Sequence, residues 1–281
     1  MRVRIIADSA CDITQERAKE LGVELIPLTT FFGDEEYQDG VTLTSREFFE
    51  KLIETDDMPH TSQIMPSQYE EVFQSVRDAG DEAVCITLSS KLSGCWNSAC
   101  IALEDFQDCV TVVDSENVCI GEQLLVMLAV RLREEGRTAA EIAAELEQQK
   151  KRIRVLALLD TLEYLKRGGR ISPAVAFAGG ILSIKPVIAV ENGEVALVGK
   201  ARGSKNGNNL LRTFVEKSGG IDFSMPYCLA YSGLSDDLLQ KYLADSRSLY
   251  EGQTENIPVS MIGSTIGTHV GPGAVAVAFF S

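Results

Sequence analysis

The sequence of 281 residues lacks the short motifs by which proteins most often hold a cofactor. It has no G-x-x-x-x-G-K-[ST] loop, no G-x-G-x-x-G after an expected strand, no G-x-S-x-G and no H-E-x-x-H. These absences exclude the usual routes to ATP, dinucleotide or catalytic zinc binding, and they leave a hydrolase triad with little support. We therefore predict no cofactor and no metal site.

Positive charge and histidine are also scarce. The net charge of −15 and the pI near 4.6 argue against nucleic-acid binding, which needs a basic face, and against docking on anionic lipid surfaces. Two histidines, His60 and His269, are too few for a histidine-rich metal site. A small anionic ligand fits this charge only if local cations oppose the overall field.

Long apolar runs are missing as well. Met1-Arg2-Val3-Arg4 leads directly into an expected strand rather than into a secretory signal, and no run approaches the length of a membrane span. The seven cysteines show no C-x-x-C spacing, which suits buried thiols in a reducing compartment. We expect a cytoplasmic protein with no stable membrane insertion.

The pattern that is present is an alternation of strands and helices. Apolar, β-branched runs such as 2–7 and 84–88 are separated by amphipathic stretches up to about residue 152, which predicts a parallel sheet. Beyond that point strands dominate, and Asn192-Gly193 between two apolar runs predicts a hairpin. We predict two α/β domains: 1–152, a parallel sheet flanked by helices, and 153–281, a mixed sheet with helices.

Capping signals mark several helix starts. Thr44 and Ser67 are each followed three residues later by Glu, which predicts two capping boxes. Asp12 is predicted to cap a helix over 14–21. The functional alternative places Asp8 or Ser9 at the mouth of a ligand cleft, where open α/β sheets bind their ligands.

The stretch 84–101 carries the strongest sign of a binding site. An apolar strand passes through a serine loop into a helix that begins near Ser93-Gly94. Unpaired N–H groups and the helix dipole at such a start favour an anion, and serine hydroxyls can add hydrogen bonds. The alternative is that Ser93 only caps its helix.

Three other segments have side chains suited to an anion: Thr61-Ser62, Gly168-Gly169-Arg170 and Thr268-His269. Arg170 offers a permanently charged planar fork for a carboxylate or phosphate. Each segment has a simpler explanation: Thr61-Ser62 as a turn, Arg170 as a solvated side chain, and His269 as a satisfied histidine in a loop over 266–273.

Together these segments resemble the DegV family, fatty-acid-binding proteins that partner a fatty acid kinase. The resemblance covers nearly the whole chain. It rests on D-S-x-x-D at 8–12, T-S-Q at 61–63, S-S-x-L-S-G at 89–94, D-T-L-x-Y-L-x-x-G-G-R-I-S at 160–172 and I-G-T-H-x-G-P-G-A at 266–274. Ile64-Met65 and Cys95-Trp96 depart from the residues usual in the family.

The resemblance implies two α/β domains with a long-chain fatty acid, about 16 to 18 carbons, held between them. It implies that Thr61 and Ser93 bind the carboxylate. The vicinity of the head group would hold Ser62, Gly94, Arg170, Thr268 and His269. Phe177 and Ile181, in an apolar helix expected over 174–182, are candidates for the wall of the acyl tunnel.

The resemblance also implies a division of labour. The chain would be a substrate-binding subunit and not an enzyme, and it would present the carboxylate to a separate ATP-dependent fatty acid kinase and retain the acyl phosphate. Arg170, and His269 when protonated, would matter more for the acyl phosphate than for the fatty acid.

Two other functions stay open. One is an enzyme or kinase subunit that handles a small carbonyl compound such as a triose through His269, in a small polar cleft. The other is a structural or regulatory α/β protein without a ligand.

Overall fold

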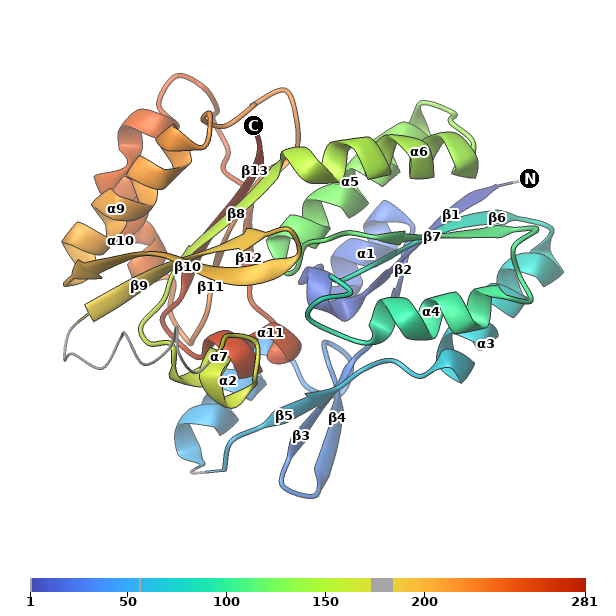
Figure 1. Ribbon diagram of the computed structural model, residues 1–281, viewed down its shortest axis with the longest axis horizontal. Helices are drawn as coiled ribbons and strands as arrows, with labels where there is room; N and C mark the ends of the chain where they lie inside the picture. The colour runs from blue at the N-terminus through green and yellow to red at the C-terminus, as the bar shows by residue number, and fades with distance from the viewer. Residues whose placement is uncertain (1, 56, 173–183) are drawn as a thin grey trace.

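The structure is a computed structural model that describes residues 2–55, 57–172 and 184–281. Its first sheet is parallel, with the strand order β2 (Val23–Ile26), β1 (Val3–Asp8), β6 (Glu82–Thr87) and β7 (Val110–Asp114). Helices α3 (Pro66–Ala79) and α4 (Cys95–Leu103) lie on one side of it, and α5 (Ile120–Glu134) and α6 (Ala139–Gln149) on the other (Figure 1). The strands are buried on both faces, which explains their continuous apolar runs.

The second sheet has six strands and is mixed. Its order is β10 (Glu194–Arg202), β9 (Ile184–Glu191), β8 (Ile153–Leu158), β13 (Val275–Phe280), β11 (Tyr227–Tyr231) and β12 (Val259–Met261). Among the pairings that the described residues form in this sheet, only that of β11 with β12 is parallel. Helices α9 (Ser204–Lys217) and α10 (Asp237–Asp245) bury Leu211, Val215 and Leu239 against it. These two sheets confirm the predicted fold class.

Helix α5 joins the two sheets because it packs against β1 on one side and β8, β11 and β13 on the other. One apolar cluster therefore runs from Ile5 in the first sheet to Phe280 in the second. Strand β8 begins at Ile153, next to the predicted limit between the domains, but that limit stays a prediction. No helix among the described residues is long and apolar enough to cross a bilayer.

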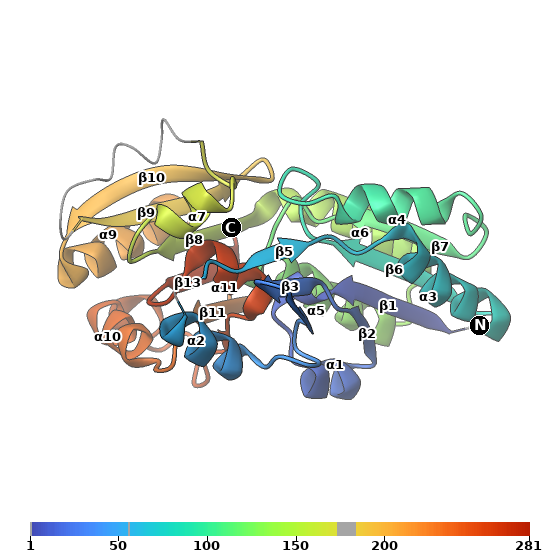
Figure 2. The same ribbon diagram turned by 90° about the horizontal axis from the view of Figure 1, so that it is seen from below.

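A small third sheet lies below the two large sheets in the view of Figure 1 and near the centre in the view of Figure 2. It is antiparallel, in the order β4 (Glu35–Gln38), β3 (Thr29–Phe32), β5 (His60–Ser62). Helix α2 (Ser45–Glu54) lies between β4 and β5 in the chain. Thr61 pairs with Thr30 in this sheet. The alternative that Thr61-Ser62 forms a turn is therefore wrong, and the strand escaped prediction because its pairing partner is remote in sequence.

The segment predicted as a loop over 266–273 begins instead as helix α11 (Ser264–Val270). Gly267 permits it to pack on α2, since a Cβ there would lie 2.5 Å from the Phe48 ring. Carboxylates of Asp12 and Asp39 hold its first N–H groups. A seven-residue helix that depends on such remote partners leaves little local pattern in the sequence.

The local signals gave mixed results. Thr44 forms the predicted capping box, and Asn192 (φ 51°) and Gly193 (φ 82°) form the predicted hairpin turn. Ser67 is not a cap, because α3 begins at Pro66. Asp12 is not a cap either: the Thr14 hydroxyl accepts from the N–H of Arg17 at the start of α1 (Gln15–Leu21). The expected helix over 174–182, with Phe177 and Ile181, lies outside the described residues.

Candidate ligand-binding site

A cavity of about 390 Å³ lies between the second sheet and segments of the first half that follow its strands. Aliphatic side chains of the second sheet line it, among them Val155, Ala157, Ile188, Val190 and Val195. Leucines of the first half, Leu28, Leu88 and Leu92, line it as well. The volume is within the range of small-molecule sites, and the lining suits an apolar ligand.

Polar groups from four separate segments meet at this cavity. The residues are Thr61, Ser62 and Gln63 of β5 and its end, Ser93 and Gly94 before α4, Arg170 after α7 (Glu163–Arg167), and Thr265 and His269 of α11. Direct contacts join these segments, such as 3.1 Å between Thr61 Oγ1 and His269 Nε2. The structure thus brings together every predicted head-group residue that it describes except Thr268.

Ser93 and Gly94 shape the start of α4. Gly94 is the N-cap and offers no side chain, while Ser93 Oγ accepts from the N–H of Cys95 at 3.3 Å and lies 3.3 Å from its Sγ. A Cβ on Gly94 would lie 1.9 Å from Oε1 of Gln63, so only glycine allows this close approach. The partly exposed hydroxyl of Ser93 also lines the cavity, and its role in binding stays a prediction.

His269 is a hydrogen-bonding group rather than a cation. Burial, and secondarily the charge of Arg170, lower its pKa to about 4. Without a ligand the imidazole is therefore neutral near pH 7, and a second positive charge from His269 would need protonation against this burial. Its Nδ1 is buried without a partner among the described residues, close to Gly168, where a Cβ would lie 2.2 Å from that nitrogen.

Arg170 is the positively charged residue among the polar residues that line the cavity. Gly169 (φ 70°) ends α7, and the N–H of Arg170 donates to the carbonyl of Leu165 at 2.9 Å. Its Nε donates to the Leu92 carbonyl at 3.2 Å and its Nη1 to the Gly168 carbonyl at 2.6 Å. Burial lowers its pKa, but a guanidinium still keeps its charge at neutral pH. These two carbonyls thus fix the orientation of the Arg170 guanidinium.

Two threonines of α11 differ from expectation. Thr268 does not line the cavity, since its hydroxyl donates to the Ser264 carbonyl at 2.8 Å inside the helix. Thr265 does line it, and its buried hydroxyl has no partner among the described residues. Thr265 could not be predicted from the sequence, because the segment was expected to be a loop and no helical pattern set the direction of its side chain.

Carboxylates of the first half hold α11 in place. Asp12 Oδ1 accepts from the N–H of Gly263 at 2.8 Å, and Asp39 Oδ1 accepts from the N–H and the hydroxyl of Ser264 at 2.9 and 2.8 Å. Burial raises the pKa of Asp12 to about 8. Asp8 lies deeper, accepts from the N–H of Leu88 at 2.8 Å, and has a pKa raised to about 7, again by burial. Asp8 and Ser9 do not line the cavity, so neither lies at its mouth.

Comparison with known proteins gives matches over the whole chain. The family model "Uncharacterised protein, DegV family" matches residues 2–281. A DegV domain-containing protein of Caldanaerobacter subterraneus is 34% identical over 279 residues, which are 99% of this chain and 98% of that protein.

Solved structures agree with this. A DegV family protein from Thermus thermophilus, described with fatty acid binding, has 32% sequence identity, a TM-score of 0.88 and full coverage of both chains. A protein from Eubacterium ventriosum described as stearic acid-binding has 27% identity and a TM-score of 0.85, and the match covers 99% of this chain and 97% of that one.

Proposed function

Because the chain belongs to the DegV family, we propose that it binds a long-chain fatty acid and presents the carboxylate to a separate ATP-dependent kinase. The observation that carries the proposal is an aliphatic cavity that is also lined by hydroxyls, a neutral imidazole and one guanidinium. Thr61 contacts His269, and Arg170 donates to the carbonyl of Gly168 beside that ring, so these groups together form the polar end of the cavity. That distribution matches a molecule with one anionic end and a long apolar tail.

The tail supplies most of the binding energy on this account. Each buried methylene contributes about 0.8 kcal/mol, so a chain of about 16 to 18 carbons contributes on the order of 10 kcal/mol before the costs of association. Branched aliphatic side chains such as Val155, Ile188 and Val190 offer contact area without polar groups that would need partners. A small polar carbonyl compound would gain little from this lining, which disfavours the triose alternative.

The carboxylate binds the hydroxyls of Thr61 and Ser93. With the proton on His269 Nε2, the imidazole donates to Thr61 Oγ1 and leaves the threonine hydroxyl hydrogen free for the ligand. Ser93 Oγ already accepts from the N–H of Cys95, so its own hydrogen can turn from the sulfur to an anion. Arg170 supplies the charge that opposes the net −15 of the chain.

Phosphoryl transfer belongs to the partner in this proposal, since the sequence has no nucleotide-binding loop. The chain holds the carboxylate at the polar end of the cavity and retains the acyl phosphate afterwards. The product carries more charge and more acceptor oxygens than the fatty acid, and Arg170 is the group suited to it.

Mass spectrometry of lipid extracted from the purified, denatured protein tests the proposal. We expect about one fatty acid per chain. A matched variant, Val195→Trp, fills the cavity from β10 and leaves the polar end intact, so it should yield much less. No extracted lipid, and no binding of added stearate by wild type, would rule the proposal out.

A further inference from the structure

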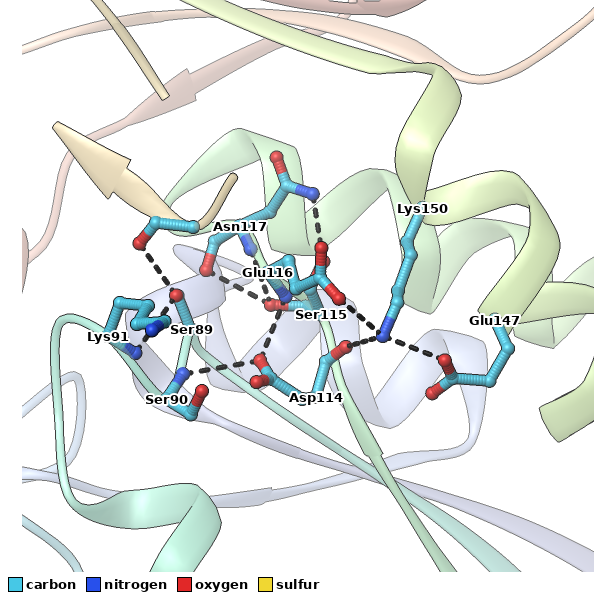
Figure 3. A network of polar contacts seen from close by, with 10 residues as sticks. Ser89, Ser90, Lys91, Asp114, Ser115, Glu116, Asn117, Glu147 and Lys150 are labelled. Atoms are coloured by element: carbon cyan, nitrogen blue, oxygen red, sulfur yellow. Dashed lines mark hydrogen bonds and ion pairs between the residues drawn. The ribbon is translucent and has the colours of Figure 1, made fainter. Parts of the chain in front are cut away.

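Ser89 lies where the loop after β6, the segment that contains Asn117 and the β9–β10 hairpin meet (Figure 3). It is fully buried, although it is a polar residue in a loop. Its N–H donates to the Asn117 carbonyl at 2.7 Å, and its own carbonyl accepts from the N–H groups of Leu92 at 3.0 Å and Ser93 at 3.1 Å. The backbone of Ser89 therefore sets the position of the candidate carboxylate ligand Ser93.

The side chain of Ser89 points to the other half of the protein. Its hydroxyl donates to the carbonyl of Gly193, at the tip of the β9–β10 hairpin, at 2.7 Å. Gly193 is buried there with φ 82°, and a Cβ on it would lie 2.6 Å from Ser89 Oγ. Glycine is thus required twice at the tip, for its backbone conformation and for this close approach.

Hydrogen bonds and ion pairs hold the segments next to Ser89 in place. Asp114 Oδ1 accepts from the N–H of Ser90 at 3.2 Å and of Glu116 at 2.9 Å. Lys150, with 6% of its side chain exposed, forms ion pairs with Glu116 at 3.0 Å and Glu147 at 2.8 Å and donates to the Asp114 carbonyl at 3.0 Å (Figure 3). Ser89 therefore lies in a part of the first half that several hydrogen bonds and ion pairs hold in place.

The two segments that meet at Ser89 line different parts of the cavity. Leu92 and Ser93 of the loop lie at the polar end, where the Leu92 carbonyl also accepts from Arg170. The hairpin supplies Ile188, Val190 and Val195 to the aliphatic wall. One hydroxyl thus connects the segment that would bind the carboxylate to the wall that would cover the acyl chain.

We propose that Ser89 is a positioning residue that couples the seating of the hairpin over the acyl chain to the placement of Ser93 at the carboxylate. The inference rests on the proposed fatty-acid binding. Loss of the hydroxyl would leave the buried Gly193 carbonyl and the N–H of Lys91 without this partner. The hairpin tip would then lift more often, and the loop that carries Ser93 would lose one of its supports.

The test compares Ser89→Ala with Ser90→Ala. Ser90 is the matched control because its contact in this network comes from its backbone N–H, which alanine keeps. We expect Ser89→Ala to release stearate to albumin about tenfold faster than wild type, and Ser90→Ala to release it at the wild-type rate. Ser89→Ala should also lose part of its preference for stearate over stearyl alcohol, which a purely structural defect would leave unchanged.

Amide hydrogen exchange gives a second readout. Ser89→Ala should speed exchange both at 190–195 and at Leu92 and Ser93. Gly193→Ala should do the same, and the double variant should show less than the sum of the two effects, because both remove one contact. Wild-type release and exchange rates in Ser89→Ala would overturn the coupling and leave fatty-acid binding standing. Failure of wild type to bind stearate would overturn both.

Discussion

Removal of the Thr61 hydroxyl tests the head-group assignment most selectively. Thr61→Val keeps the β-branched shape in strand β5 and deletes the hydrogen-bonding oxygen. One hydrogen bond to a charged ligand contributes about 1.5–3 kcal/mol, so the variant should bind stearate roughly 10- to 100-fold more weakly. The variant also leaves His269 Nε2 without its partner at 3.1 Å, so some loss of stability is expected as well.

The assay is isothermal calorimetry with stearate, and urea unfolding measures the free energy of unfolding separately. Thr61→Ser restores a hydroxyl and should recover most of the affinity. Thr268→Val is the matched control, because that hydroxyl bonds inside α11 and does not line the cavity. Wild-type affinity in Thr61→Val, or an equal loss in Thr268→Val, would refute the assignment.

Three further predictions follow from the same contacts. Arg170→Ala should slow kinase-coupled turnover by a larger factor than it lowers fatty-acid affinity, measured side by side; equal factors would limit Arg170 to the carboxylate. Gly168→Ala should displace the His269 ring, which a Cβ would approach to 2.2 Å, and weaken stearate binding. Gly136→Ala strains the backbone at φ 82° but its Cβ meets no atom within 4 Å, so it controls for a general loss of stability and should leave binding unchanged. Asp12 has a folded pKa of about 8 against an ordinary value of 3.8, so the folded form keeps a proton that the unfolded form loses, and the free energy of unfolding falls as pH rises between those values. Asp12→Asn should reduce that slope in urea unfolding at a series of pH values, and Asp8, with its pKa of about 7, should supply part of what remains; an unchanged slope would show that Asp12 does not contribute to it.

Local sequence signals predicted the parts of the fold that local interactions form. Thr44 with its capping box, and Asn192-Gly193 with two positive φ angles, need no remote partner. Strand β5 and helix α11 were missed because their partners are distant: Thr61 pairs with Thr30, and the start of α11 is held by Asp12 and Asp39.

In the candidate site, too, the sequence indicated some features, and others depended on tertiary structure. The family motifs pointed to Thr61, Ser93, Arg170 and His269, which the structure gathers around one cavity, while their roles stay predictions. The charge of His269 could not be predicted, because burial, a tertiary property, lowers its pKa. The family motif also did not indicate where the side chain of Thr268 points, and its hydroxyl forms a hydrogen bond within its own helix.

Carbon-13 NMR of stearate labelled at the carboxyl carbon tests the central claim most directly. With wild-type protein the account predicts one bound resonance that keeps the chemical shift of a carboxylate from about pH 7 down to about pH 4, because hydroxyl donors and Arg170 stabilise the ionised form and lower the pKa of the bound carboxyl. The same resonance should shift in Thr61→Val and stay in place in Thr268→Val. A bound carboxyl that titrates like the free acid in water, or no bound resonance, would contradict the account.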